Sequence, residues 1–169
     1  PIPDVPVMAS ALRPAAFELC GELADGAISW VCPGRYLSEV GLPALKRGAE
    51  ATGRAVPPLV AHMPVCVHDD PFEARAEFRE QFGRYAASPF YQRMFELAGY
   101  PEALEGRWSD AMVESVLVTG DEESVARGIQ EMFERGVSEV LVSISTAGTD
   151  SARSRRRTID LVAALATAP

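Results

Sequence analysis

Short apolar runs alternate with longer amphipathic stretches along this chain. In the longer stretches the apolar residues recur at helical spacing, whereas the short runs are the length of buried strands. The apolar runs predict strands over Val5–Ala9, Ala27–Val31, Leu59–Val67 and Val137–Ile144. Helices are predicted over about 14–24, 35–51, 71–87, 89–98 and 119–135, with a last helix carrying Ile159, Leu161, Val162 and Leu165. The order is therefore strand and helix, repeated four times.

Several residues predict where these elements begin, end or distort. Asp70-Pro71 is a typical helix start, with a capping carboxylate followed by proline in the first turn. Thr119 with Glu122 reads as a capping box for the next long helix. Pro64 has no N–H for a ladder hydrogen bond, so we expect a bulge or a sheet irregularity there.

The alternation predicts an α/β fold of the (β/α) TIM-barrel type. Strands separated by helices form parallel sheets with right-handed crossovers, and four such units are half of an eight-fold barrel. We expect one domain over residues 1–169, with an extra helical insertion at about 88–117, before the last strand. Four strands cannot close a barrel, so both outer strands would be unpaired edges. The expected cover is a missing N-terminal half-barrel or a second copy of the chain.

Composition narrows the class of partner. The chain has 169 residues, 47% of them hydrophobic and 24% charged, and a net charge of −8, which disfavours nucleic acid and anionic membranes. No apolar run is long enough to span a membrane, and no secretory signal is visible. Three cysteines without metal-like spacing do not form a disulfide framework, so we expect reduced thiols and a cytoplasmic location. A small-molecule substrate remains as the expected partner.

The first strand-to-helix turn is the strongest candidate site. Ser10 and Ala11 fall where a parallel strand ends and a helix opened by Pro14 begins. Free backbone N–H groups, the positive end of the helix and the Ser10 hydroxyl would converge there, which suits an anion, most often a phosphate. Arg13 adds a cation. The alternative is an ordinary structural turn.

Three stretches carry a resemblance to a known family. The turn A-S-A-L-R-P (9–14), followed by E-L-A-D-G-A-I-S-W (22–30), resembles the luciferase-like monooxygenase superfamily. The segments at 89–101 and 118–143 resemble its branch that uses the deazaflavin coenzyme F-420. The resemblance covers nearly the whole chain, but only the second half of the family's barrel. It implies hydride transfer between the deazaflavin and an organic substrate, with FMN-dependent monooxygenation as the alternative.

The resemblance also implies the site residues. Cofactor-binding positions would be Ala9, Ser10, Ala11, Leu12 and Arg13, and Trp30, Cys32 and Tyr91 would belong to a substrate pocket. Most ring contacts would come from the missing half, so the chain alone would be inactive; a non-catalytic half-barrel that dimerises is the other possibility. No catalytic residue and no metal ligand is predicted.

Two further groups have competing interpretations. Phe90, Tyr91, Met94 and Phe95 form an apolar patch that would be either a core stripe or a hydrophobic lid over a substrate pocket. His62 lies in the middle of a predicted strand and His68 at a strand end, and neither has a second histidine or a cysteine beside it, which favours hydrogen-bonded structural imidazoles over a catalytic base.

Overall fold

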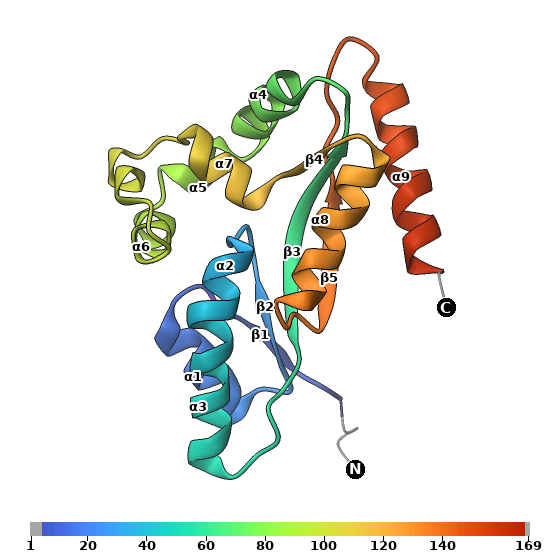
Figure 1. Cartoon of the computed structure of the whole chain (residues 1–169). Coiled ribbons are helices and arrows are strands. Elements are labelled where there is room, and N and C mark those ends of the chain that lie inside the picture. The colour runs from blue at the N-terminus through green and yellow to red at the C-terminus, as the bar shows by residue number, and fades with distance from the viewer. Residues whose placement is uncertain (1–4, 168–169) are drawn as a thin grey trace.

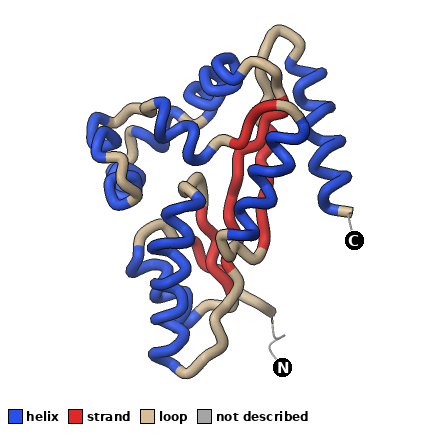
Figure 2. The backbone as a smooth tube through the Cα atoms, in the orientation of Figure 1, coloured by secondary structure: helices blue, strands red, loops and turns tan. Residues whose placement is uncertain are grey.

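The computed structural model describes residues 5–167, in which parallel strands form one sheet with helices around it (Figures 1 and 2). The strands are β1 (Met8–Ser10), β2 (Gly26–Ser29), β3 (Leu59–Val67), β4 (Val118–Gly120) and β5 (Glu139–Ile144). The helices are α1 (Pro14–Leu23), α2 (Gly34–Tyr36), α3 (Leu42–Thr52), α4 (Pro71–Gln81), α5 (Gly83–Ala86), α6 (Pro89–Leu97), α7 (Asp110–Val116), α8 (Glu122–Glu134) and α9 (Ser151–Ala166). A π-helical turn, η1 (Leu37–Gly41), joins α2 to α3, and a 3-10 turn, η2 (Pro101–Glu105), precedes α7.

Strand β3 is the centre of the sheet, and it is buried along its whole length. Val65 pairs with Val118 of β4 and with Ile144 of β5, so β4 and β5 lie on opposite edges of β3. Ala61 pairs in the same way with both β2 and β5. Strands β2 and β4 therefore share one edge of β3, with β2 along its first half and β4 at its end. Every pairing is parallel, as the alternating pattern predicted.

The helices fall into groups that Figure 1 separates clearly. Helices α1 and α3 pack against each other beside β1 and β2, while α8 and α9 lie along β3 and β5. The helices α4 to α7 form a group of their own beyond the carboxyl ends of the strands. Their core is aromatic: Phe78, Phe82, Phe95 and Trp108 contact one another with ring centroids 4.8–5.2 Å apart along the series.

The first strand differs from the sequence prediction. It was expected as a buried strand over Val5–Ala9, but β1 covers Met8–Ser10 and is exposed. On α1, the apolar side chains of Leu19 and Leu23 are 54% and 72% exposed. The exposure of β1, Leu19 and Leu23 has one cause. Strand β1 pairs with β2 alone among the described residues, so no described residue covers its outer edge or the neighbouring face of α1.

Tertiary contacts decide the outcome of two local predictions, at Thr119 and at Pro64. Thr119 does not cap a helix, because it lies in β4 and its hydroxyl donates to the backbone oxygen of Cys66; Asp121 caps α8 instead, accepting from the N–H of Ser124. Strand β3 has no bulge at Pro64, whose pairing with β5 is in register, but the pairing along its other edge is interrupted around Pro64. Pro64 faces the other edge, between the end of β2 and the start of β4, where no strand requires its N–H.

Other boundaries are confirmed. Asp70 caps α4 through the N–H of Phe72, at 2.8 Å, with Pro71 in the first turn. The helix predicted over 35–51 is present as α2, η1 and α3 in direct succession, and Gly53 ends α3 with a positive φ of 69°. No helix within residues 5–167 has the length and apolarity that crossing a membrane requires.

Candidate functional site

The turn between β1 and α1 is held from two sides. The N–H of Ala11 donates to the backbone oxygen of Ile28 in β2, at 2.9 Å. The buried hydroxyl of Tyr36 donates to the backbone oxygen of Leu12, at 3.0 Å, and burial raises the pKa of this phenol. The turn is therefore a rigid part of the fold rather than a free loop.

Several hydrogen-bond donors of this turn have no partner in the described part of the chain. The N–H groups of Leu12, Arg13 and Ala15 donate to no acceptor there, and neither does the Ser10 hydroxyl. Helix α1 is ten residues long, and its first turn adds the partial positive charge of a helix N-terminus. These groups are the donors that an anion uses at the start of a helix.

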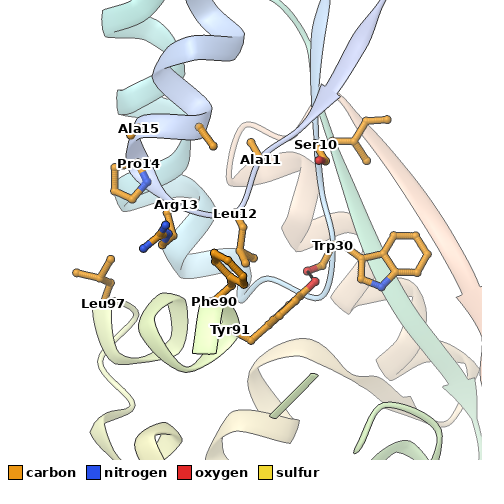
Figure 3. A pocket seen from close by; sticks show the side chains of 12 residues that line it. Ser10, Ala11, Leu12, Arg13, Pro14, Ala15, Trp30, Phe90, Tyr91 and Leu97 are labelled. Atoms are coloured by element: carbon orange, nitrogen blue, oxygen red, sulfur yellow. Dashed lines mark hydrogen bonds between the residues drawn. The ribbon is translucent and has the colours of Figure 1, made fainter. Parts of the chain in front are cut away.

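Arg13 supplies a positive charge at the turn between β1 and α1. Its guanidinium lies 5.6 Å from the ring centre of Phe90 on α6 (Figure 3), and it forms no salt bridge with any described residue. By contrast, two arginines near α1 and α3 form salt bridges, Arg47 with Glu18 and Arg54 with Asp25. A cation resting on an aromatic face, with its charge otherwise free, can contact an anion without breaking an existing pair.

A pocket of about 710 Å³ opens at this turn. The turn, the end of β2 and the helix α6 line it together, and none of the lining residues is acidic. In Figure 3, Arg13 and Trp30 lie on either side of Leu12, Phe90 and Tyr91. The lining residues are Ser10, Ala11, Leu12, Arg13, Pro14, Ala15, Ala16, Ile28, Trp30, Phe90, Tyr91 and Leu97. The pocket thus has a donor-rich end and an otherwise apolar wall.

Tyr91 connects the helical group to the strand ends. Its hydroxyl donates to the backbone oxygen of Trp30, at 3.0 Å (Figure 3), and desolvation raises the pKa of this phenol. The next residue, Val31, is buried and has φ of 51°, a left-handed conformation that is strained for a β-branched side chain. The β2 end is therefore held in one specific shape at the pocket.

The structure brings together most of the residues that the sequence proposed for the site. Ser10, Ala11, Leu12, Arg13, Trp30 and Tyr91 share the pocket. Ala9 does not line it, and lies instead beside an apolar groove between β1 and α1. Cys32 is 4% exposed and outside the pocket lining, and burial raises the pKa of its thiol to about 12. Cys32 is therefore an inert core thiol in this fold.

The apolar patch on α6 divides between the two interpretations. Met94 and Phe95 are fully buried in the core, whereas Phe90 is 62% exposed and, with Tyr91, faces the pocket. Leu97 and Ile28 also line the pocket, and neither was predicted as a site residue. No local motif marks them, because they are brought in by helix packing and strand pairing.

The two histidines also differ from each other. His68 lies 2.7 Å from a carboxylate oxygen of Glu73, five residues away in α4. His62 is 2% exposed, and its Nε2 lies 2.7 Å from the Ser143 hydroxyl. His62 is therefore a buried, hydrogen-bonded imidazole as expected, but its Nδ1 has no hydrogen-bond partner in the described residues.

Comparison with known families decides the affiliation of the chain. The family model of luciferase-like monooxygenases matches residues 1–139. The chain belongs to this family. Two uncharacterised proteins, from Mycobacterium bovis and Mycobacterium tuberculosis, are each 30% identical to this luciferase-like chain over 162 residues. Each match covers 83% of this chain and 48% of the relative.

Solved structures share the fold at lower identity. An F420-dependent secondary alcohol dehydrogenase in complex with an F420–acetone adduct matches with a TM-score of 0.74 and 19% identity, over 98% of this chain and 50% of that one. The F420-dependent tetrahydromethanopterin reductase of Methanopyrus kandleri follows at 0.64 and 21%, over 93% and 51%. The oxygenating constituent of 3,6-diketocamphane monooxygenase from Pseudomonas putida, in complex with FMN, gives 0.58 and 18%, over 95% and 47%. This luciferase-like chain thus has the half-barrel fold that its sequence predicted, and it spans about half the length of these proteins.

Proposed function

We propose that the pocket at the β1–α1 turn binds the phosphate-bearing part of coenzyme F-420, and that the chain is part of an F-420-dependent oxidoreductase. The observation that carries this is the set of free N–H groups and the uncommitted Arg13 charge at one end of the pocket. The F420-dependent neighbours support the choice of cofactor, and FMN, bound by another neighbour, is the alternative.

The residues of the pocket fit such a group. A phosphate needs donors and positive charge, which Arg13 and the first turn of α1 supply, and the pocket has no acidic side chain that would repel it. The apolar remainder, with Trp30, Phe90 and Tyr91, suits a flat ring and an organic substrate. When bound, the deazaflavin or flavin would supply hydride transfer. The chain itself would bind, orient and exclude water.

Titration of the wild-type chain with F-420, FMN and riboflavin tests the proposal. Riboflavin carries the ring of FMN without its phosphate. Replacing Arg13 by glutamine should weaken F-420 and FMN binding about 10-fold to 100-fold, because a hydrogen bond to a charged group contributes about 1.5–3 kcal/mol. Riboflavin binding should change little. The matched control is Arg127→Gln on the distant helix α8, which should leave all affinities unchanged.

Two results would contradict the proposal. One is wild-type protein that binds neither F-420 nor FMN, which would leave a non-catalytic half-barrel as the better interpretation. The other is an Arg13→Gln variant that loses riboflavin and FMN affinity equally, since the loss would then not concern the phosphate.

We also propose that further strand–helix units cover the two open edges of the sheet. On one side, Val7, Leu19 and Leu23 are more than half exposed around an apolar groove of about 280 Å³. On the other, β5 pairs with β3 alone among the described residues, and Leu141 is 46% exposed. This chain spans about half the length of its relatives, which leaves room in those longer chains for such units.

The alternative cover is a second copy of this chain. Light scattering on the purified protein separates the two: a stable dimer of 18.2 kDa chains favours the second copy. A monomer whose Leu19→Glu and Leu23→Glu variants gain solubility favours cover by a different half-barrel. A monomer as soluble and stable as these variants would argue against any cover at this face.

A further inference from the structure

His62 is an unusual residue to find at the centre of this sheet. It lies on β3, is 2% exposed, and keeps one polar atom, Nδ1, buried without a partner among the described residues. An apolar side chain of similar shape would avoid that loss of hydration. The imidazole therefore needs an explanation beyond the filling of space.

The ring of His62 lies flat against the indole of Trp30. The two ring centres are 3.5 Å apart and the planes differ by 10°. The Nε2 atom of His62 lies 2.7 Å from the Ser143 hydroxyl on β5, within hydrogen-bond distance. The ring centres of His62 and Phe82 are 6.1 Å apart. The hydrogen bond restricts rotation of the imidazole about its last side-chain torsion. Its plane, and hence the plane of any ring stacked on it, is set by β5.

Trp30 is constrained from its backbone as well. Tyr91 donates to its carbonyl oxygen at 3.0 Å, and the strained residue Val31 follows it. A series of aromatic contacts also connects His62 with Tyr91: His62 contacts Phe82, Phe82 contacts Tyr85, and Tyr85 contacts Tyr91. The indole nevertheless stays 36% exposed and lines the pocket. A large apolar ring that is both exposed and held at several points is suited to binding.

We propose that His62 is a positioning residue for Trp30, and that the indole it holds is a platform on which a flat conjugated ring stacks. The ring would be that of the bound cofactor or of a planar substrate, so the inference rests on the proposed function of the pocket. His62 itself touches no ligand, because Trp30 and Phe82 cover it. Its role is to keep the indole plane fixed, so that ring binding does not have to order a mobile side chain.

Fluorine NMR on protein labelled with 5-fluorotryptophan tests the positioning without any ligand. The chain has two tryptophans, and Trp30→Phe assigns the signals. Trp108 is an internal control for the fold, since it is 8% exposed and its Nε1 donates to the Phe82 backbone oxygen. In His62→Gln, which keeps a polar group for Ser143 but has no ring, the Trp30 signal should move toward that of free 5-fluorotryptophan while the Trp108 signal stays.

A second variant separates the stack from the hydrogen bond. His62→Phe keeps a flat ring against the indole and has no bond to Ser143, so the Trp30 signal should lie between those of wild type and His62→Gln. Riboflavin, used as a ring without phosphate, should bind in the order wild type, His62→Phe, His62→Gln, with a loss of about tenfold in the last. Binding of inorganic phosphate should be the same in all three.

Three outcomes would overturn the inference. The first is a Trp30 signal in His62→Gln that equals that of wild type. The second is a Trp108 signal that moves together with that of Trp30 in both variants, which would show a purely structural role. The third is a Trp30→Ala variant that binds riboflavin as tightly as wild type. Failure of the proposed function looks different: neither F-420 nor FMN would bind, while the NMR result for His62 would stand unchanged.

Discussion

Helices α1 and α3 cross at two glycines, and this crossing supports the turn between β1 and α1. A Cβ on Gly48 of α3 would lie 1.9 Å from the backbone oxygen of Glu18 in α1. A Cβ on Gly21 of α1 would lie 2.1 Å from the backbone oxygen of Leu45 in α3. The two backbones therefore touch directly, and Gly48→Ala must push the helices apart or tilt them.

The magnitude follows from two opposing effects. Alanine stabilises a helix interior by about 0.5–1 kcal/mol relative to glycine. Overpacking by one carbon typically costs about 1–3 kcal/mol, and the upper end applies because the opposing atoms are backbone and cannot rotate away. We expect Gly48→Ala to lower the free energy of unfolding by about 2 kcal/mol. Gly83→Ala is the matched control, since no atom lies within 4 Å of its added Cβ; it should be neutral or stabilising by up to about 1 kcal/mol.

Urea unfolding followed by far-UV circular dichroism measures both variants against wild type. Because α1 begins at the turn that we propose as the phosphate site, Gly48→Ala should also weaken FMN binding at urea concentrations where the variant remains folded. A Gly48→Ala midpoint equal to or above that of wild type would refute the steric argument. So would an equal loss of stability in Gly83→Ala, which would show that glycine flexibility rather than close packing matters.

Two further predictions concern buried titratable groups. Burial lowers the pKa of His62 to about 4, from 6.5, so the unfolded chain binds a proton on His62 more tightly than the folded chain does. The free energy of unfolding should therefore fall by about 2 kcal/mol as the pH drops from 7 to 5. Urea unfolding at both pH values measures it, and a His62→Phe variant with the same pH dependence would contradict it. Burial raises the pKa of Cys32 to about 12, so iodoacetamide should modify Cys32 in urea and not in buffer; mass spectrometry that finds it modified in the native state would contradict this.

Local signals in the sequence predicted the features that depend on neighbouring residues. The nine residues of β3 were predicted as a strand because, apart from His62, they are nearly all apolar, as expected for a strand covered on both faces. The start of α4 at Asp70 and the end of α3 at Gly53 follow from capping and from glycine's access to positive φ. The proposal of an anion site at Ser10 and Arg13 also rests on chain order, since it needs only a strand followed by a helix.

Contacts between distant segments could not be predicted in the same way. Strand β4 has three residues and pairs with β3, more than fifty positions earlier, so its sequence reads as the end of one helix and the cap of the next. Tyr91 reaches Trp30 across 61 positions, and His62 reaches Ser143 across 81. Neither pair has a sequence signal, because each depends on which side chains face one another after packing.

The sequence by itself determined most of the order of strands and helices, the half-barrel fold and the family, and it predicted the turn that we propose as an anion site. These follow from periodicity, capping and local charge, which act over a few residues. Only the tertiary structure decided that Arg13 rests on Phe90, that Tyr91 and His62 hold Trp30, and that Cys32 is buried away from the pocket. The physical reason is that packing places side chains by shape and exclusion of water, and those depend on the whole fold at once.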